Sequence, residues 1–219
     1  MVELAHQNRY VGVPTLSTSY EACYVKLLLV GGFLGSGKTT LLLEIARRLT
    51  ADSERIAIIE NEVGEVGIDG AYLRRQGLEV QEMFGGCVCC TLSVDLVTTL
   101  KKLEPLFHPE RVILEASGVA RPGDIVPTVR QYASMVEHVQ VLVLVDASRY
   151  DMLMEVMHPM VTAQIEAAQV VAVNKIDEID ASEVDRISTG VQGVNGEARV
   201  LAISAEKRIN LEAVMDALR

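Results

Sequence analysis

Six short apolar runs recur between residue 25 and the end of the chain, each followed by a polar or glycine-rich turn. They occupy residues 25–32, 55–60, 111–116, 139–147, 169–175 and 198–204. A short run that is apolar throughout is typical of a strand buried on both faces of a sheet. The pattern therefore predicts a set of interior strands.

Helical periodicity fills the intervals between these runs. Apolar residues recur at helical spacing in residues 38–50, and further helices are predicted near 92–104, 122–136, 160–168, 181–189 and 210–219. Alternating strands and helices require right-handed crossovers, so the fold class predicted is α/β, with a mainly parallel central sheet and helices on both faces. We expect one domain over residues 25–219, preceded by an aperiodic and poorly ordered arm over 1–24.

A glycine-rich stretch, GGFLGSGKTT at residues 31–40, lies between the first predicted strand and the first predicted helix. Its spacing, G-x-x-x-x-G-K-[ST], is that of a phosphate-binding loop and predicts a P-loop NTPase (G-domain) architecture. Glycines let backbone N–H groups point at a phosphate, and the helix N-terminus adds partial positive charge. Lys38 is expected to reach the β- and γ-phosphates, and the Thr39 hydroxyl to ligate Mg²⁺. The predicted nucleotide contacts here are Gly32, Gly35, Ser36, Gly37, Lys38, Thr39 and Thr40.

A second polar turn, Asn174-Lys175-Ile176-Asp177, begins at the end of the fifth apolar run. Ligands of open parallel sheets bind at the carboxyl ends of the strands. The Asp177 carboxylate can accept from N1–H and the exocyclic amine of guanine, which adenine does not offer in that arrangement. A backbone N–H of Ser204 or Ala205, after the last strand, is expected to meet guanine O6. The alternative interpretation is a polar strand-to-helix turn.

The third run ends in RVILEASG, which places Glu115 and Gly118 after a buried strand. An acidic residue at this point holds Mg²⁺ or its water shell in phosphate-transferring enzymes. Gly118 is expected to donate its N–H to a γ-phosphate and so to report nucleotide state. With Lys38, these are the predicted catalytic residues.

Composition excludes several partners. The formal net charge is −10, and an acidic chain lacks the lysines and arginines that nucleic-acid binding requires. No run approaches the roughly 18–20 apolar residues of a membrane span, and the first 25 residues lack a secretory signal. We therefore expect a cytoplasmic protein that binds neither nucleic acid nor membrane.

Three of the four cysteines fall within GGCVCC, as Cys87, Cys89 and Cys90. A reducing compartment disfavours structural disulfides, and adjacent cysteines bridge only with strain. Closely spaced thiolates favour Zn²⁺ or another borderline or soft metal. A redox-active pair and simple packing of small apolar side chains are the alternatives.

The motifs GGFLGSGKTT, ENEVGEVGIDG, GGCVCC, EASGVARP and NKID occur in an order that resembles the CobW-like branch of the P-loop GTPases. The resemblance covers about residues 25–219. It implies GTP and Mg²⁺ as ligands, delivery of zinc, cobalt or another transition metal under nucleotide control, a client metalloprotein or cofactor enzyme as partner and, in many members, a homodimer. Members usually carry a second, smaller C-terminal domain; we expect this sequence to comprise the GTPase domain without it.

The resemblance also assigns the acidic residues of ENEVGEVGIDG. One of them is implied to approach the nucleotide Mg²⁺, with Glu62 and Asp69 as the candidates. Glu60 and Glu65 are implied to lie near the cysteines and to complete the transition-metal site with Cys87, Cys89 and Cys90.

Two functional hypotheses follow. The first is a slow, Mg²⁺-dependent GTP hydrolase whose nucleotide state gates a cysteine-rich metal site, acting as a metallochaperone or metal-insertion factor. The second is a nucleotide-gated regulator or scaffold with no role in metal delivery. A methionine-rich stretch is interpreted as core filler rather than as a soft-metal site: Met152, Met154, Met157, His158 and Met160.

Overall fold

A seven-stranded sheet runs through the centre of the protein, with strand order β3-β2-β4-β1-β5-β6-β7 and every pairing parallel. The computed structural model describes residues 24–60, 79–82 and 91–219. The strands are β1 (Val25–Gly32), β2 (Ile56–Glu60), β3 (Glu79–Glu82), β4 (Arg111–Glu115), β5 (Val136–Asp146), β6 (Val170–Asn174) and β7 (Arg199–Ala202).

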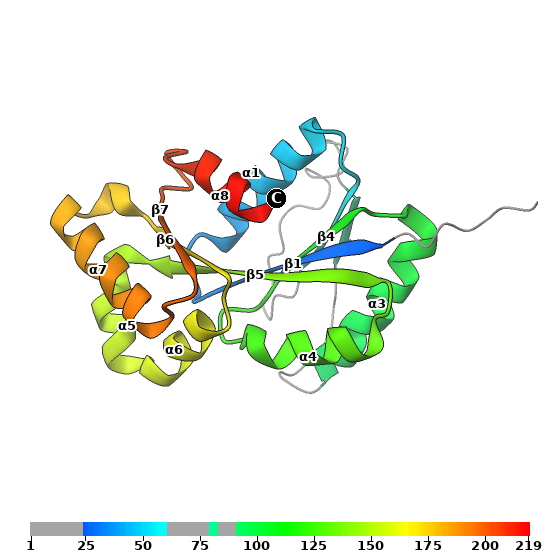
Figure 1. Ribbon diagram of the computed structural model, residues 1–219, viewed down its shortest axis with the longest axis horizontal. Helices are drawn as coiled ribbons and strands as arrows, with labels where there is room; N and C mark the ends of the chain where they lie inside the picture. The colour runs from blue at the N-terminus through cyan, green and yellow to red at the C-terminus, as the bar shows by residue number, and fades with distance from the viewer. Residues whose placement is uncertain (1–23, 61–78, 83–90) are drawn as a thin grey trace, which may run out of the picture.

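Helices cover both faces of this sheet (Figure 1). One face carries α1 (Lys38–Ala51) and α8 (Leu211–Leu218). The other face carries α3 (Thr91–Phe107), α4 (Pro122–Tyr132), α5 (Tyr150–Val156), α6 (His158–Glu166) and α7 (Ala181–Val194). Two short 3₁₀ turns, η1 (Ala147–Arg149) and η2 (Ile176–Glu178), follow β5 and β6.

Alternate residues of a strand serve the two cores, as the pleat requires. In β1, Leu27 and Leu29 pack toward α3–α7, whereas Leu28 and Val30 pack toward α1 and α8. Because helices cover both sides, the central strands are buried on both faces and read as unbroken apolar runs. The α/β class expected from the sequence, with helices on both faces of the sheet, is confirmed, and the sheet is wholly parallel in the described part of the chain.

Three elements differ from expectation. The edge strand β3, with the sequence EVQE, and the helix α5 were not predicted. The helix expected over 122–136 ends at Tyr132, because the chain turns there and Val25 N–H donates to Met135 O at 2.9 Å. Residues from Val136 onward therefore belong to β5 and the sheet.

The described helices include none that is both long and apolar enough to cross a bilayer. The expected arm over residues 1–24 falls, except for Tyr24, outside the described residues.

Candidate nucleotide-binding site

The phosphate loop joins the end of β1 to the start of α1, at the carboxyl edge of the sheet. Gly37 has a φ of 93°, in the left-handed region that favours glycine. A Cβ at Gly37 would lie 2.4 Å from Asn174 Nδ2, and a Cβ at Gly32 would lie 2.5 Å from Leu144 O. Both positions therefore need glycine for backbone shape and for space.

The interior of this loop is polar. Lys38 is 6% exposed, and its Nζ donates to Phe33 O at 3.4 Å, across the loop. Ser36 is fully buried, and its Oγ has no hydrogen-bond partner among the described residues. By contrast, Gly35 and Thr40 are exposed at the loop surface. A buried ammonium at the N-terminus of a helix, beside a glycine-rich loop, suits an anionic ligand.

Thr39 and Glu115 form the hard-oxygen part of the site. Thr39 Oγ1 donates to the Glu115 carboxylate and lies 2.9 Å from each of its oxygens. Glu115 ends β4 and pairs in register with Val30 of β1, which explains how residues 76 positions apart meet. A hydroxyl beside a carboxylate is a donor set that Mg²⁺ prefers, so these residues fit the ion.

Gly118 packs against the phosphate loop. A Cβ at Gly118 would lie 2.7 Å from Leu34 N. Gln164 of α6 is buried, and its Nε2 donates to Gly118 O at 3.3 Å and to Ala120 O at 2.9 Å. The segment after Glu115 is therefore fixed beside the loop from both sides.

Asn174 joins three segments of the site. Its Nδ2 donates to Ser36 O at 2.8 Å, and its Oδ1 accepts from Ala205 N–H at 2.9 Å. The side chain thus ties the phosphate loop and the turn after β7 to the end of β6. This contact is a reason for the Asn of the Asn-Lys-x-Asp pattern that is independent of any base.

Lys175 follows Asn174 and adopts a left-handed conformation with φ of 68°. Its side chain contacts Asp146, whereas that of Asp177 is exposed. Asp177 is exposed, and its pKa lies below the usual range because the Ser204 side chain donates a hydrogen bond to it, with Lys207 and Lys175 adding positive charge. An exposed carboxylate that stays ionised can accept hydrogen bonds from a base.

Ser204 and Ala205 lie beside this turn. Ser204 N–H donates to Ile209 O at 3.3 Å, and Ala205 N–H donates to Asn174. Both donors are thus engaged within the protein, and their contact with guanine O6 stays a prediction.

Two site residues, Asp146 and Arg149, escaped the sequence analysis. Asp146, at the end of β5, is fully buried and binds Lys175 and Arg149. The signal available was an aspartate directly after a long apolar run, which marks the same sheet edge as Glu115 and Asn174.

Most of the predicted metal ligands lie outside the described residues: the transition-metal candidates Glu65, Cys87, Cys89 and Cys90, and the Mg²⁺ candidates Glu62 and Asp69. Glu60 is the last residue of β2, where its backbone pairs in register with Glu115 of β4 and with Glu82 of β3. Within residues 24–60, 79–82 and 91–219, no group of three His, Cys, Asp or Glu side chains is arranged to hold a metal. Met154 and Met157 pack against the core, in keeping with their interpretation as filler, but that interpretation is wrong for Met152, which is 49% exposed.

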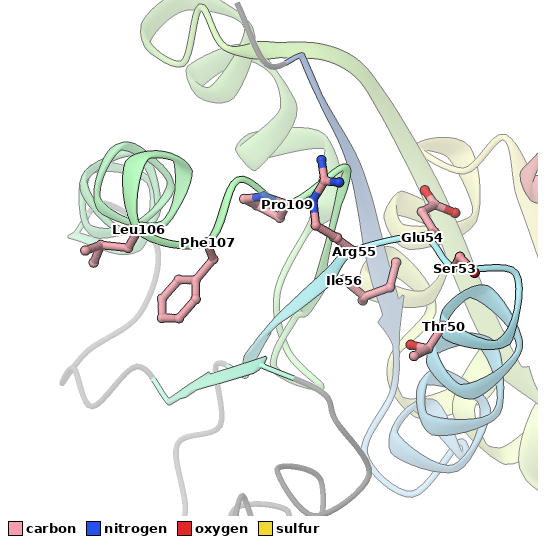
Figure 2. Close-up of a pocket in the computed structure, with 8 residues that line it drawn as sticks. All are labelled: Thr50, Ser53, Glu54, Arg55, Ile56, Leu106, Phe107 and Pro109. Carbon is pink, nitrogen blue, oxygen red and sulfur yellow. The ribbon is translucent and has the colours of Figure 1, made fainter. Parts of the chain in front are cut away.

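A pocket of about 410 Å³ lies at the opposite, amino edge of the sheet (Figure 2). Figure 2 shows Leu106 and Phe107 of α3 on one side and, on the other, Thr50 in the last turn of α1 with Ser53 and Glu54 just after the helix. None of the predicted nucleotide contacts lines it. The candidate site is therefore the carboxyl edge of the sheet.

Comparison with known proteins agrees with this geometry. Residues 26–202 match the model of the CobW/HypB/UreG nucleotide-binding domain. The chain belongs to this family. It is 30% identical over 190 residues to the zinc chaperone YjiA of Escherichia coli, covering 82% of this chain and 58% of that protein. It is 38% identical over 104 residues to the zinc chaperone CobW of Sinorhizobium sp, covering 44% of this chain and 29% of that protein.

Solved structures of the CobW/HypB/UreG family share the fold. The hydrogenase maturation factor HypB of Archaeoglobus fulgidus superposes with a TM-score of 0.65 at 17% identity, covering 91% of this chain and 90% of that one. The Zn(II)-bound YjiA GTPase of E. coli gives 0.57 at 26% identity, covering 82% and 57%. The chain spans between 29% and 58% of the length of the two zinc chaperones above.

Proposed function

We propose that this protein binds and hydrolyses GTP with Mg²⁺, and that its nucleotide state gates a cysteine-rich transition-metal site through which it serves as a metallochaperone. The observation that carries the nucleotide part is the side chain of Asn174, which holds the phosphate loop and the turn after β7 together. This bridge sets Asp177 at a fixed distance from the phosphate loop, as a nucleoside di- or triphosphate requires.

Guanine selection rests on Asp177. Its carboxylate is exposed at the edge of the site and, with a pKa below the usual range, is ionised at neutral pH. An ionised carboxylate accepts two hydrogen bonds, and guanine offers two adjacent donors. A site built around such a pair rejects a base that lacks the donors.

Mg²⁺ would be held by Thr39 and Glu115, whose oxygens already meet at 2.9 Å. When bound, the ion would offset negative charge on the phosphates. Glu62 and Asp69 are the further candidates for its shell. Lys38 would bind the β- and γ-phosphates, and Gly118 would contact the γ-phosphate from its place beside Leu34. We expect slow intrinsic turnover, because such sites often gain their full apparatus from a partner or a second copy.

The metal part rests on where the described strands end. Glu82, Glu60 and Glu115 are neighbours in register at the carboxyl ends of β3, β2 and β4. Neighbouring strands lie about 4.8 Å apart, so the chain leaving Glu82 toward Cys87 starts roughly 10 Å from Glu115. Relatives named zinc chaperones and a zinc-regulated GTPase metalloprotein activator support zinc as cargo.

In this proposal Cys87, Cys89 and Cys90 bind Zn²⁺ or Co²⁺ together with Glu60 or Glu65, and the cargo passes to a client metalloprotein in the cytoplasm. Homodimerisation would supply groups missing from the single chain. The alternative, a nucleotide-gated regulator or scaffold, would leave the cysteines as packing or redox groups.

The nucleotide part is tested by measuring the binding of GTP and of ATP, each with and without Mg²⁺. The metal part is tested on protein purified without a histidine tag, by mass spectrometry of its metal content and by titration of its free thiols. The proposal predicts a strong preference for GTP that requires Mg²⁺, and metal-dependent loss of free thiols. Equal binding of the two nucleotides would contradict the guanine assignment. GTP binding without any metal-dependent thiol loss would favour the regulator or scaffold.

A further inference from the structure

One buried carboxylate lies between the phosphate loop and the turn over residues 174–177, which is called the base turn from here on. Asp146 ends β5, and its side chain is 0% exposed. Its Oδ2 accepts from Lys175 Nζ at 2.8 Å and from Arg149 Nε at 2.8 Å and Nη2 at 2.7 Å. Its Oδ1 accepts from Ser148 Oγ at 2.9 Å. Ser148, Arg149 and Lys175 thus all donate to this carboxylate, and two of the three are cations.

Arg149 carries this cluster to the phosphate loop. The same Nη2 that contacts Asp146 also donates to Leu34 O at 2.7 Å. A Cβ at Gly35 would lie only 3.0 Å from Nη2, so the guanidinium sits directly against the loop. The guanidinium can donate to the Asp146 carboxylate and to Leu34 O at the same time because its N–H donors are fixed in one plane.

Lys175 carries the cluster to the base turn. It lies between Asn174 and Asp177, in the left-handed conformation that turns its side chain back toward Asp146. A left-handed non-glycine residue costs free energy and persists only where its surroundings fix it. The ion pair with Asp146 supplies such a restraint.

The state of the carboxylate is consistent with this role. Burial raises the pKa of Asp146, but hydrogen bonds from Lys175, Arg149 and Ser148 outweigh burial and hold the pKa below the usual range. The carboxylate is therefore ionised at neutral pH, when both cations are engaged.

We propose that Arg149 is a positioning residue for the phosphate loop, and that Asp146 is an anchor shared by Arg149 and Lys175 which couples the phosphate half of the site to the base half. Arg149 acts through Leu34 and Gly35 rather than by contact with the nucleotide. The inference rests on the proposed nucleotide function, but its phosphate part holds whichever base the site prefers.

The two halves can be measured separately with ligand pairs. The affinity ratio of GDP to GMP reports the phosphate loop, because only GDP has a β-phosphate. The ratio of GDP to IDP reports the base turn, because inosine lacks the exocyclic amine that Asp177 would bind. Affinities would be measured on the full chain by calorimetry or by competition with a fluorescent nucleotide.

Arg149→Ala should lower the GDP to GMP ratio about tenfold and leave the GDP to IDP ratio unchanged, since a charge-assisted hydrogen bond of this kind typically contributes that much. Asp146→Asn should lower both ratios. Arg149→Lys should fall between, because an ammonium has the charge without the planar fork. In the double variant Arg149→Ala with Asp146→Asn, the loss in the GDP to GMP ratio should match that of the larger single variant.

Arg186→Ala is the matched control, because Arg186 also pairs with two carboxylates, Asp151 and Glu183, but on the surface of α5 and α7. It should leave both ratios at the wild-type values. If Arg149→Ala lowers GDP and GMP affinity equally in a folded protein, the positioning role is wrong. If Asp146→Asn leaves the base ratio intact, the coupling is wrong. A wild-type GDP to IDP ratio near one would contradict guanine selection and not the role of Arg149.

Discussion

Asn174 is the residue at which the two halves of the nucleotide site meet. It is 3% exposed, and it satisfies both Ser36 O and Ala205 N–H. A buried polar group left without a partner costs about 1–3 kcal/mol. Replacing Asn174 with an apolar residue would leave both of these backbone groups without their partner. Aspartate, although similar in shape, cannot donate to Ser36 O. The amide is therefore required for the structure of the site before any nucleotide binds.

Replacement of Asp177 by asparagine tests base selection. The amide keeps one acceptor and adds a donor that clashes with the guanine donors, so GTP affinity should fall by about tenfold or more. Xanthine has a carbonyl where guanine has its amine, so XTP affinity should rise. Competition binding measures both. Glu178→Gln, at the next exposed position, is the control and should change neither affinity.

Asp146→Asn tests the charge state of the anchor through stability. The folded pKa of Asp146 is lowered, so its stabilising effect is full above the unfolded pKa of about 3.9 and is lost as pH falls toward the folded pKa. The variant should therefore unfold with about 2 kcal/mol less free energy than wild type at pH 7.

That difference should shrink as pH falls below about 4, because the wild-type carboxylate becomes neutral too. Denaturant unfolding at several pH values measures it. Asp216→Asn is the control, since Asp216 is an exposed partner of Arg219 and should shift stability little. A difference that stays constant between pH 7 and pH 3 would show that the ion pairs of Asp146 are not its source.

The phosphate loop and the base turn could be predicted from the sequence because the residues of each are contiguous and form a pattern of fixed spacing. Asp146 and Arg149 carry no such spacing. Their partners lie 29 positions away at Lys175 and 115 positions away at Leu34. Only the folded sheet brings these residues together, and for this reason sequence reasoning passed over them.

At the scale of elements, the site is made by the carboxyl ends of adjacent strands. The ends of β1, β4, β5 and β6 supply the phosphate loop, Glu115, Asp146 and Asn174. Strand order places β1 between β4 and β5, so the phosphate loop lies centrally (Figure 1). Glu115 and Gly118 follow β4 on one side of it, and the base turn follows β6 on the other. Such a switch point in the strand order is where open parallel sheets bind ligands.

Gly118→Ala tests the contact between the segment after β4 and the phosphate loop. The new Cβ would lie 2.7 Å from Leu34 N, so the loop or the segment must shift. GTP affinity and hydrolysis should fall by about tenfold, while the helix content measured by circular dichroism should not change.

Gly193→Ala is the matched control, because nothing lies within 4 Å of the Cβ that it adds near the end of α7. This variant should keep wild-type GTP affinity and gain up to about 0.5–1 kcal/mol of stability from helix propensity. Wild-type GTP binding by Gly118→Ala would contradict the close packing of that segment.

Strand predictions succeeded where the sequence has an apolar run, including the edge strand β7, and failed at the other edge strand, β3. The strand β3 has two glutamates and a glutamine among its four residues, so it lacks the unbroken apolar run that marks a central strand. An edge strand has a neighbour on one side only, and polar residues are tolerated there. The helix α4 was predicted too long because the apolar residues of the turn and of β5 continued its spacing.

At the scale of the whole molecule, the chain leaves β2 and β3 toward the proposed metal ligands at the same edge of the sheet that carries the nucleotide site. Glu60 pairs in register with Glu115, and Glu82 pairs with Glu60, so the segments on either side of β3 start next to the Mg²⁺ residues. If Glu115 or Thr39 moves when a γ-phosphate is lost, we expect these neighbouring segments to be displaced as well. Coupling of this kind is reciprocal, so metal must also change nucleotide affinity.

The most direct test is the affinity for Zn²⁺ or Co²⁺ in the GDP form and in the form holding a non-hydrolysable GTP analogue, measured with a competing chelator. The account predicts a difference of roughly 5–150-fold between the two forms. In the double variant Cys89→Ser with Cys90→Ser, metal affinity should fall and the nucleotide dependence should vanish, with GDP binding nearly intact. Equal metal affinity in the two nucleotide states of the wild-type protein would contradict the account.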